Sequence, residues 1–472
     1  MLEALRPVYV IAHREIRDQF RDWRIVFPII ILTILFPFLM NYTAQEMLGF
    51  VSKYGGEIVG ERLIPFLLMI VGFFPSSFSL IIALETFVGE KERGSIEPLL
   101  STPLEDWQLY LGKLSSAVVP PLFGSFLGMS VYLGGLAIGR VPLPDGEMMA
   151  LIILLTIVQA VMMVSGAVVV SCQATSVRAA NLLSSFIIIP VTLLIQGESM
   201  LMFWGNYSTL WMAFFGVILL TFLLFRMGLA YFRREELLGR EIDVLNLRWG
   251  WNTFWQAFTG GARNVWQWYR RVLPKTLKKL WLPFLIVFVL GAAGVVIGFS
   301  LVRQFPIVAP PGMLEEMEER LGLLSEVFAP GEFGPVFMIL GNNLRVMALA
   351  LLLGIFTFSV LGVIPIIVTM AVVGYILGIL GLNGLPAATY FVGLILPHAW
   401  LEIPAALLAT AAVLRFGALL ATPAQGKKIG QVWLEALAVW AQVMIGFVIP
   451  ALFVAAMIEV WITPRLAFLV LR

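Results

Sequence analysis

The sequence has a single cysteine, Cys172, so it cannot form an intrachain disulfide and offers no cysteine-based metal site. Charged residues are also scarce: they make up 13% of the 472 residues, against about 25% in soluble domains. The net charge of +2 indicates no nucleic-acid partner. Apolar residues make up 60% of the chain, and they recur in runs close to the roughly 20 residues that cross a bilayer. These features exclude soluble, fibrous and disordered proteins and predict an all-α, polytopic bundle of transmembrane helices.

Apolar stretches between polar or turn-rich breaks predict eleven membrane spans. The fifth is short and contains Pro190, and only Gly362 separates the eighth from the ninth, which indicates a tight hairpin. The predicted spans are 25–43, 63–84, 109–138, 149–171, 182–197, 208–228, 281–303, 342–361, 363–381, 389–413 and 433–460.

Basic residues are distributed unevenly between the two sides of these spans. With the N-terminus inside, 23 of the 31 lysines and arginines lie in inner segments or at the inner ends of spans, and 8 lie in outer segments or at the outer ends of spans. The positive-inside rule therefore predicts a cytoplasmic N-terminus, and the odd number of spans places the C-terminus outside. We expect a multi-pass protein of the cell (inner or cytoplasmic) membrane. No small-residue cleavage site follows the first apolar run, so a cleavable signal peptide is not expected.

Two segments outside the spans have the pattern of helices that lie on a membrane surface. Residues 2–24 carry separate apolar and charged faces, and residues 251–269 place Trp251, Trp255 and Trp266 on one side of a predicted helix. The second segment belongs to a basic, tryptophan-rich stretch for which membrane lipid is the favoured partner and a cytoplasmic protein the alternative. This stretch, 233–280, separates a domain of six spans, 1–232, from one of about five, 281–472.

The connection between the second and third spans carries a charged string followed by an apolar turn. Residues 89–103 read GEKERGSIEPLLSTP. A short charged helix is expected to end near Gly94, after which Pro98, Leu99 and Leu100 form an apolar knob that faces the cytosol. Such a knob suits a groove on a soluble partner. An ordinary charged connector is the alternative interpretation.

This string resembles the signature of ABC-2-type transporter permeases, and the resemblance extends to about Tyr231. It implies that the loop contacts a nucleotide-binding ABC ATPase subunit, which would bind ATP and Mg, and that residues 196–207 form a re-entrant segment. No G-x-x-x-x-G-K-[ST] string occurs in the chain, so we expect neither a bound cofactor nor enzymatic activity in the chain itself. The implied ATPase-coupling residues are Glu90, Glu92, Arg93, Gly94, Glu97, Pro98 and Leu99.

Polar and ionisable residues also occur within the spans of the second half. Such residues are costly in a membrane and by default indicate a functional site or a buried partner. The motif from Pro397 to Pro404 is expected to interrupt the tenth span, and the spacing of His398 and Glu402 places them on one helix face within hydrogen-bonding reach. The group consists of Asn342, Asn343, Arg345, Asn383, His398, Glu402 and Glu459.

This second pattern resembles the stage II sporulation protein M family over about residues 275–464, including five spans. The shared features are an N-N-x-R start, an N-G turn, a P-H-x-x-x-E-x-P-A helix and a late glutamate. Ala399 departs from the glycine that is common after the histidine. One line of this family acts with cell-wall-remodelling proteins during sporulation, so the resemblance implies a membrane fold more than a defined activity.

Three interpretations of the pair His398 and Glu402 remain open. A mutually satisfied structural pair, with or without Arg345, is favoured over a proton- or substrate-handling site. A metal site comes third, because the only other histidine, His13, precedes the first span.

The favoured function is that of the transmembrane subunit of an ABC exporter, acting as a homodimer with a separate ATPase and an unknown substrate. Short outer loops, such as residues 43–62, argue against the ABC proteins that carry large outer domains. One alternative is a membrane scaffold for envelope or cell-wall remodelling without transport. Another is an intramembrane enzyme that uses His398 and Glu402, although no obvious nucleophile lies beside them.

Overall fold

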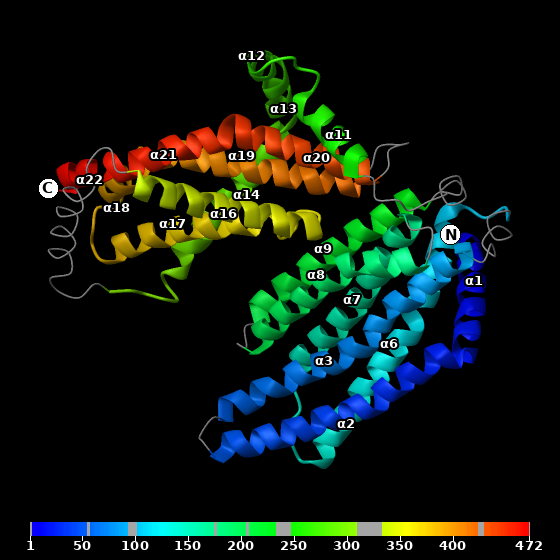
Figure 1. Cartoon of the computed structure of the whole chain (residues 1–472). Coiled ribbons are helices and arrows are strands. Elements are labelled where there is room, and N and C mark those ends of the chain that lie inside the picture. Colours follow the sequence, from blue (N-terminus) through cyan, green and yellow to red (C-terminus); the bar gives the residue numbers. More distant parts are fainter. Residues whose placement is uncertain are drawn as a thin grey trace. The chain divides into compact units, whose positions relative to one another are not determined.

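The computed structural model describes residues 2–53, 57–92, 102–173, 177–203, 207–232, 247–308, 333–422 and 429–471. Within these ranges the chain forms helices and connecting segments and contains no strand, which confirms the predicted all-α fold. Ten helices in this part of the chain are long and apolar enough to cross a membrane. The chain divides into two compact units, residues 1–245 and residues 246–472 (Figure 1).

The first unit is a bundle of long helices. Their ends follow local signals: the backbone N–H of Glu105 donates to Gln108 Oε1 (3.0 Å) where α6 begins, and Asp145 accepts from the N–H of Met148 (2.9 Å) where α7 begins. The helices are α1 (Leu2–Arg21), α2 (Trp23–Lys53), α3 (Glu57–Leu84), α4 (Glu90–Glu92), α6 (Asp106–Ile138), α7 (Gly146–Gln173), α8 (Val177–Phe203) and α9 (Tyr207–Tyr231), with a π-helical turn, η1 (Glu85–Gly89), between α3 and α4.

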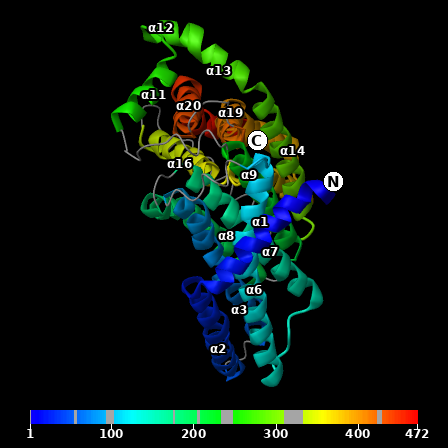
Figure 2. The same cartoon turned by 90° about the vertical axis from the view of Figure 1, so that its right-hand side faces the viewer.

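Helix α1 forms as the sequence predicts, and it crosses α6 (Figure 2). Gly112 of α6 makes this crossing close, because a Cβ at that position would lie 2.9 Å from Cβ of Ile11. Ile11 and its neighbour Ala12 are buried. Part of the apolar face of α1 is therefore covered by the protein itself.

Helix α8 differs from the prediction in two respects. It continues without a break through Gln196 to Phe203, so the re-entrant segment expected from residue 196 onward is wrong as far as Phe203, and residues 204–206 lie outside the described part. Its described apolar portion, Val191–Phe203, is shorter than a full span. The ten candidate spans therefore match all the predicted spans except the fifth, 182–197.

The second unit contains the remaining helices, several of which continue into one another through π-helical turns. They are α11 (Leu247–Thr259), α12 (Val265–Gln267), η2 (Trp268–Val272), α13 (Leu273–Lys279), α14 (Trp281–Leu301), α16 (Gly334–Phe356), α17 (Ile364–Leu382), α18 (Ala387–Tyr390), η3 (Phe391–Ile395), α19 (Leu396–Ala421), α20 (Ile429–Val443), η4 (Met444–Val448), α21 (Ile449–Trp461) and α22 (Thr463–Leu471).

Helices α14 and α17 pack with their backbones in contact. A Cβ at Gly298 would overlap the carbonyl oxygen of Ala371, and a Cβ at Gly374 would overlap that of Val295. Only glycine permits this approach, which is a common way for membrane helices to associate. Helix α19 packs against α14, α16, α20 and α21, and it supplies the buried Ala405, Ala409 and Ala412 to the core of the unit.

The tryptophan-rich segment is not the single helix that its periodicity predicts. Helix α11 ends at Thr259, and Gly260 and Gly261 follow with φ of 55° and 78°, a conformation that other residues rarely adopt. Asn264 then caps the next helix by accepting from the N–H of Gln267 (2.8 Å). The turn brings Trp268 back onto Phe258, with ring centroids 5.4 Å apart.

Candidate functional site

A lysine lies fully buried near the start of α6 and holds two carboxylates from other helices. Lys113 Nζ is 3.0 Å from Glu15 Oε1 of α1 and 2.7 Å from Glu90 Oε2 of α4. The Lys113 side chain is 0% exposed, and its ammonium also lies 5.6 Å from the centroid of the Phe87 ring. Because isolated burial of a charge is very costly, these ion pairs are what allow the ammonium to lie here.

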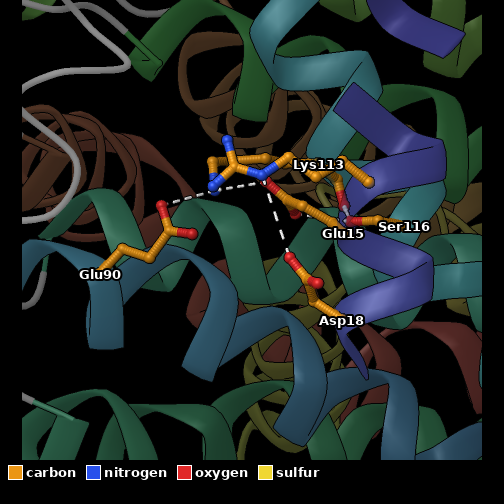
Figure 3. Close-up of polar contacts among 6 residues, drawn as sticks. Glu15, Asp18, Glu90, Lys113 and Ser116 are labelled. Atoms are coloured by element: carbon orange, nitrogen blue, oxygen red, sulfur yellow. Dashed lines mark hydrogen bonds and ion pairs between the residues drawn. The ribbon is translucent and has the colours of Figure 1, made fainter. Parts of the chain in front are cut away.

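The second oxygen of Glu15 also has a partner. Ser116, one turn after Lys113 on α6, donates its hydroxyl to Glu15 Oε2 (2.9 Å). In Figure 3, Glu90 lies on one side of Lys113, and Glu15 and Ser116 lie together on the other. We call these four residues the Lys113 cluster; it ties α1, α4 and α6 together at one place.

Glu90 links this cluster to the predicted coupling loop. It is the first residue of α4, which ends at Glu92, and Glu92 is exposed. The other predicted coupling residues, Arg93, Gly94, Glu97, Pro98 and Leu99, lie outside the described residues. Glu90 thus joins the helix that begins the predicted loop to Lys113 of α6.

Glu90 is among the residues predicted from the sequence, whereas Glu15 and Lys113 are not. A signal for Lys113 was present, because it is an ionisable residue inside the predicted span 109–138. Its partners could not be read from spacing, since Glu15 and Lys113 are 98 positions apart.

A second buried carboxylate of this unit was also missed. Glu198 of α8 and Gln159 of α7 are 3% and 2% exposed, and Gln159 Nε2 donates to Glu198 Oε2 (2.6 Å). This bond joins α7 to α8 inside the bundle.

The second unit gathers several of the predicted polar residues at one end of its helices. The cluster comprises Asn343 of α16, His398 and Glu402 of α19, Glu459 of α21 and Thr463 of α22, and we call it the α19 cluster. Helix α19 runs through the motif from Pro397 to Pro404, so the predicted interruption of the span is wrong. Pro397 lies in the first turn of α19, where its missing N–H is not needed.

The contacts within the α19 cluster differ from those predicted. His398 and Glu402 share a helix face, but His398 Nε2 is 4.0 Å from Glu402 Oε2, which is too long for a hydrogen bond. Glu402 Oε1 instead accepts from Asn343 Nδ2 (3.0 Å), and His398 Nδ1 lies 3.3 Å from Thr463 Oγ1. The pair is therefore not mutually satisfied.

The remaining predicted polar residues lie apart from this cluster. Asn342 and Arg345 are exposed, and within the described ranges Arg345 forms no ion pair with Glu402. The proposed inclusion of Arg345 in the pair is therefore wrong. Asn383 Nδ2 donates to the carbonyls of Ile307 and Ile379 (2.9 Å each), a structural role at the end of α17.

Comparison with protein families assigns each half of the chain. Residues 9–206 match the model of the ABC-2 family transporter protein, and residues 284–464 match that of stage II sporulation protein M. Searches of curated proteins and of solved structures give no match. The two matches follow one another along the chain, as the two resemblances in the sequence predict.

Proposed function

We propose that the chain is the transmembrane subunit of an ABC exporter that a separate ATPase subunit energises. The ABC-2 match identifies the first unit as the membrane part of a transporter, and that family implies an ABC ATPase partner. The observation that carries the proposal is the Lys113 cluster, which joins the start of the predicted coupling loop to α1 and α6.

The cluster gives a physical route from the ATPase to the membrane. When the partner binds or hydrolyses ATP, it moves the loop of residues 93–103, and α4 moves with it. Glu90 transmits this motion to Lys113 through an ion pair of 2.7 Å. Lys113 belongs to a continuous helix of 33 residues, about 50 Å long at 1.5 Å per residue, so a shift at this end reaches the far side of the membrane.

Several further features belong to this proposal. ATP and Mg bind in the partner, and two copies of the chain assemble with two ATPase subunits. The N-terminus and the coupling loop face the cytoplasm and the C-terminus faces outward, as the distribution of basic residues predicts. The aromatic residues of α11 contact membrane lipid, since Trp251 and Trp255 are exposed and stack at 5.8 Å.

The test is a charge swap in the loop. Arg93→Glu combined with Glu97→Arg is expected to abolish co-purification of a subunit that contains a Walker A sequence, or to uncouple its ATP hydrolysis from substrate. The matched control is Glu61→Arg combined with Arg62→Glu, on the side predicted to face outward. Subunit composition and ATP hydrolysis of the purified complex are the measurements.

Unchanged association and substrate-stimulated hydrolysis in the loop variant would show that the coupling assignment is wrong. Wild-type complexes without any ATPase would instead favour the scaffold function, which the match to stage II sporulation protein M supports as the second candidate.

A further inference from the structure

We propose that the α19 cluster binds a divalent transition-metal cation through His398, Glu402 and Glu459. One ligand atom from each of these residues lies within 4.8 Å of the other two. From the sequence, a metal site is the third of three interpretations of His398 and Glu402, because histidines and cysteines alone offer too few ligands. The structure adds Glu459, which follows His398 by 61 positions and reaches it through the packing of α21 on α19.

The hydrogen bonds around His398 fix which of its nitrogens can bind a metal. The hydroxyl of Thr463 donates its single proton to the carbonyl of Ile458 (3.2 Å). With that hydroxyl orientation its oxygen accepts from His398 Nδ1 (3.3 Å), which assigns the ring proton to Nδ1. The lone pair of Nε2 is left facing Glu402, which is the arrangement that metal-binding histidines adopt when another group holds their second nitrogen.

A hydrogen bond also orients the carboxyl group of Glu402. Asn343 donates to Oε1 (3.0 Å) and leaves Oε2 directed at His398 Nε2. Within the residues that the structure describes, no lysine or arginine pairs with Glu402 or Glu459. A ring nitrogen and two carboxyl groups therefore lie within 4.8 Å of one another without a paired lysine or arginine, an arrangement that either protonation or a bound cation would relieve.

The distances favour a metal ion over a shared proton. A proton shared between His398 and Glu402 requires about 2.7–2.9 Å between nitrogen and oxygen, whereas the two atoms are 4.0 Å apart. Metal–ligand bonds of about 2.0–2.2 Å place two ligands of one ion roughly 3–4 Å apart. The 4.0 Å between His398 Nε2 and Glu402 Oε2 falls at the upper end of that range. The ligand atom of Glu459 lies within 4.8 Å of the other two, so a side-chain movement of about 1 Å would bring it into the range.

The ligand set identifies the class of cation. One imidazole and two carboxylates suit zinc, manganese or iron in the divalent state better than calcium or magnesium, which prefer oxygen alone. The His398 and Glu402 side chains are 15% and 28% exposed, so the site can be reached by the ion. The ion would hold α19 to α21 at this end of the unit.

The test uses the full chain, purified without a histidine tag and stripped with a chelator, and titrated with Zn²⁺ and with Mn²⁺ by calorimetry. We expect one site per chain. Glu459→Gln and His398→Gln should each weaken binding at least about 10-fold, and Thr463→Val should weaken it by about 10-fold because the Nδ1 partner is lost. The control is His13→Gln, which changes the only other histidine and should leave affinity unchanged.

If these variants fail to fold, electron paramagnetic resonance of Mn²⁺ bound to the wild-type chain tests the proposal without them. The wild-type chain and His13→Gln should both show magnetic coupling to one imidazole nitrogen, which then belongs to His398. No metal binding, affinity that His398→Gln and Glu459→Gln leave unchanged, or bound Mn²⁺ without nitrogen coupling would each overturn the proposal.

Discussion

The Lys113 cluster and the α19 cluster each contain two carboxylates at one end of a helix bundle, but only the first contains a cation. Lys113 lies within 3.0 Å of both Glu15 and Glu90, and its side chain is fully buried. Glu402 and Glu459 have no such partner among the described residues, and they lie beside the lone pair of His398. The first cluster pairs its carboxylates with a cation of the chain itself, whereas we propose that the second takes its cation from outside.

This difference suggests different roles for the two polar clusters. An ion-paired group that joins three helices is suited to transmit motion, because breaking it leaves charges buried without compensation. A group with excess negative charge is suited to bind something, because its stability then depends on the ligand. On the two proposals, the same residue types would serve coupling in the first unit and binding in the second.

The largest expected effect follows from removing the cation of the first cluster. Lys113→Met should lower the free energy of unfolding by about 3 kcal/mol, since it removes the cation that Glu15 and Glu90 share; the 31% exposure of Glu90 keeps the loss at the lower end of the usual range. Denaturant unfolding of the purified chain measures it. Adding Glu15→Gln and Glu90→Gln to Lys113→Met should recover much of the loss, and no recovery would mean that the ion pairs are not what stabilises this region.

A smaller effect, of opposite sign, is expected in the second cluster. In metal-free protein, Glu459→Gln should raise the free energy of unfolding by about 1 kcal/mol, because it removes the repulsion between two carboxylates in a medium of intermediate dielectric. With Zn²⁺ at about 100 times its dissociation constant the wild type gains about 2.7 kcal/mol, and the order of stability reverses. Glu15→Gln should be destabilising with or without metal. Equal effects of Glu459→Gln and Glu15→Gln would remove the distinction between the clusters.

Much of the arrangement was predictable from the sequence. Span boundaries and basic residues predict that the start of the eighth and tenth spans and the end of the eleventh lie on the same side, and Asn343, His398 and Glu459 do meet there. The charged string and the polar motif also lead to the two families that the comparisons find. The apolar pattern indicates where the spans lie because a segment that crosses a membrane must satisfy its backbone hydrogen bonds internally, as a helix does.

The pairing of side chains between helices was not predictable. Periodicity identifies the face of a helix but not the residue that it meets, so neither Lys113 with Glu15 nor Glu402 with Asn343 follows from spacing. The break at Gly260 and Gly261 was signalled by the glycines themselves, and aromatic periodicity was wrongly given more weight.

The smallest expected effect comes from an exposed ion pair on α1, the helix that carries Glu15 of the Lys113 cluster. Arg14 Nε and Asp18 Oδ2 are 3.9 Å apart with side chains 79% and 61% exposed, so water and salt screen them and Asp18→Asn should cost no more than about 0.5 kcal/mol. Glu15→Gln changes a carboxylate three residues earlier that is 16% exposed and bonded to both Lys113 and Ser116, and it should cost several times more. Denaturant unfolding of both variants at low and at high salt measures how far salt screens each charge, and so separates the effect of burial from that of charge alone. If Asp18→Asn destabilised the chain as much as Glu15→Gln, burial of the Lys113 cluster would not explain its strength.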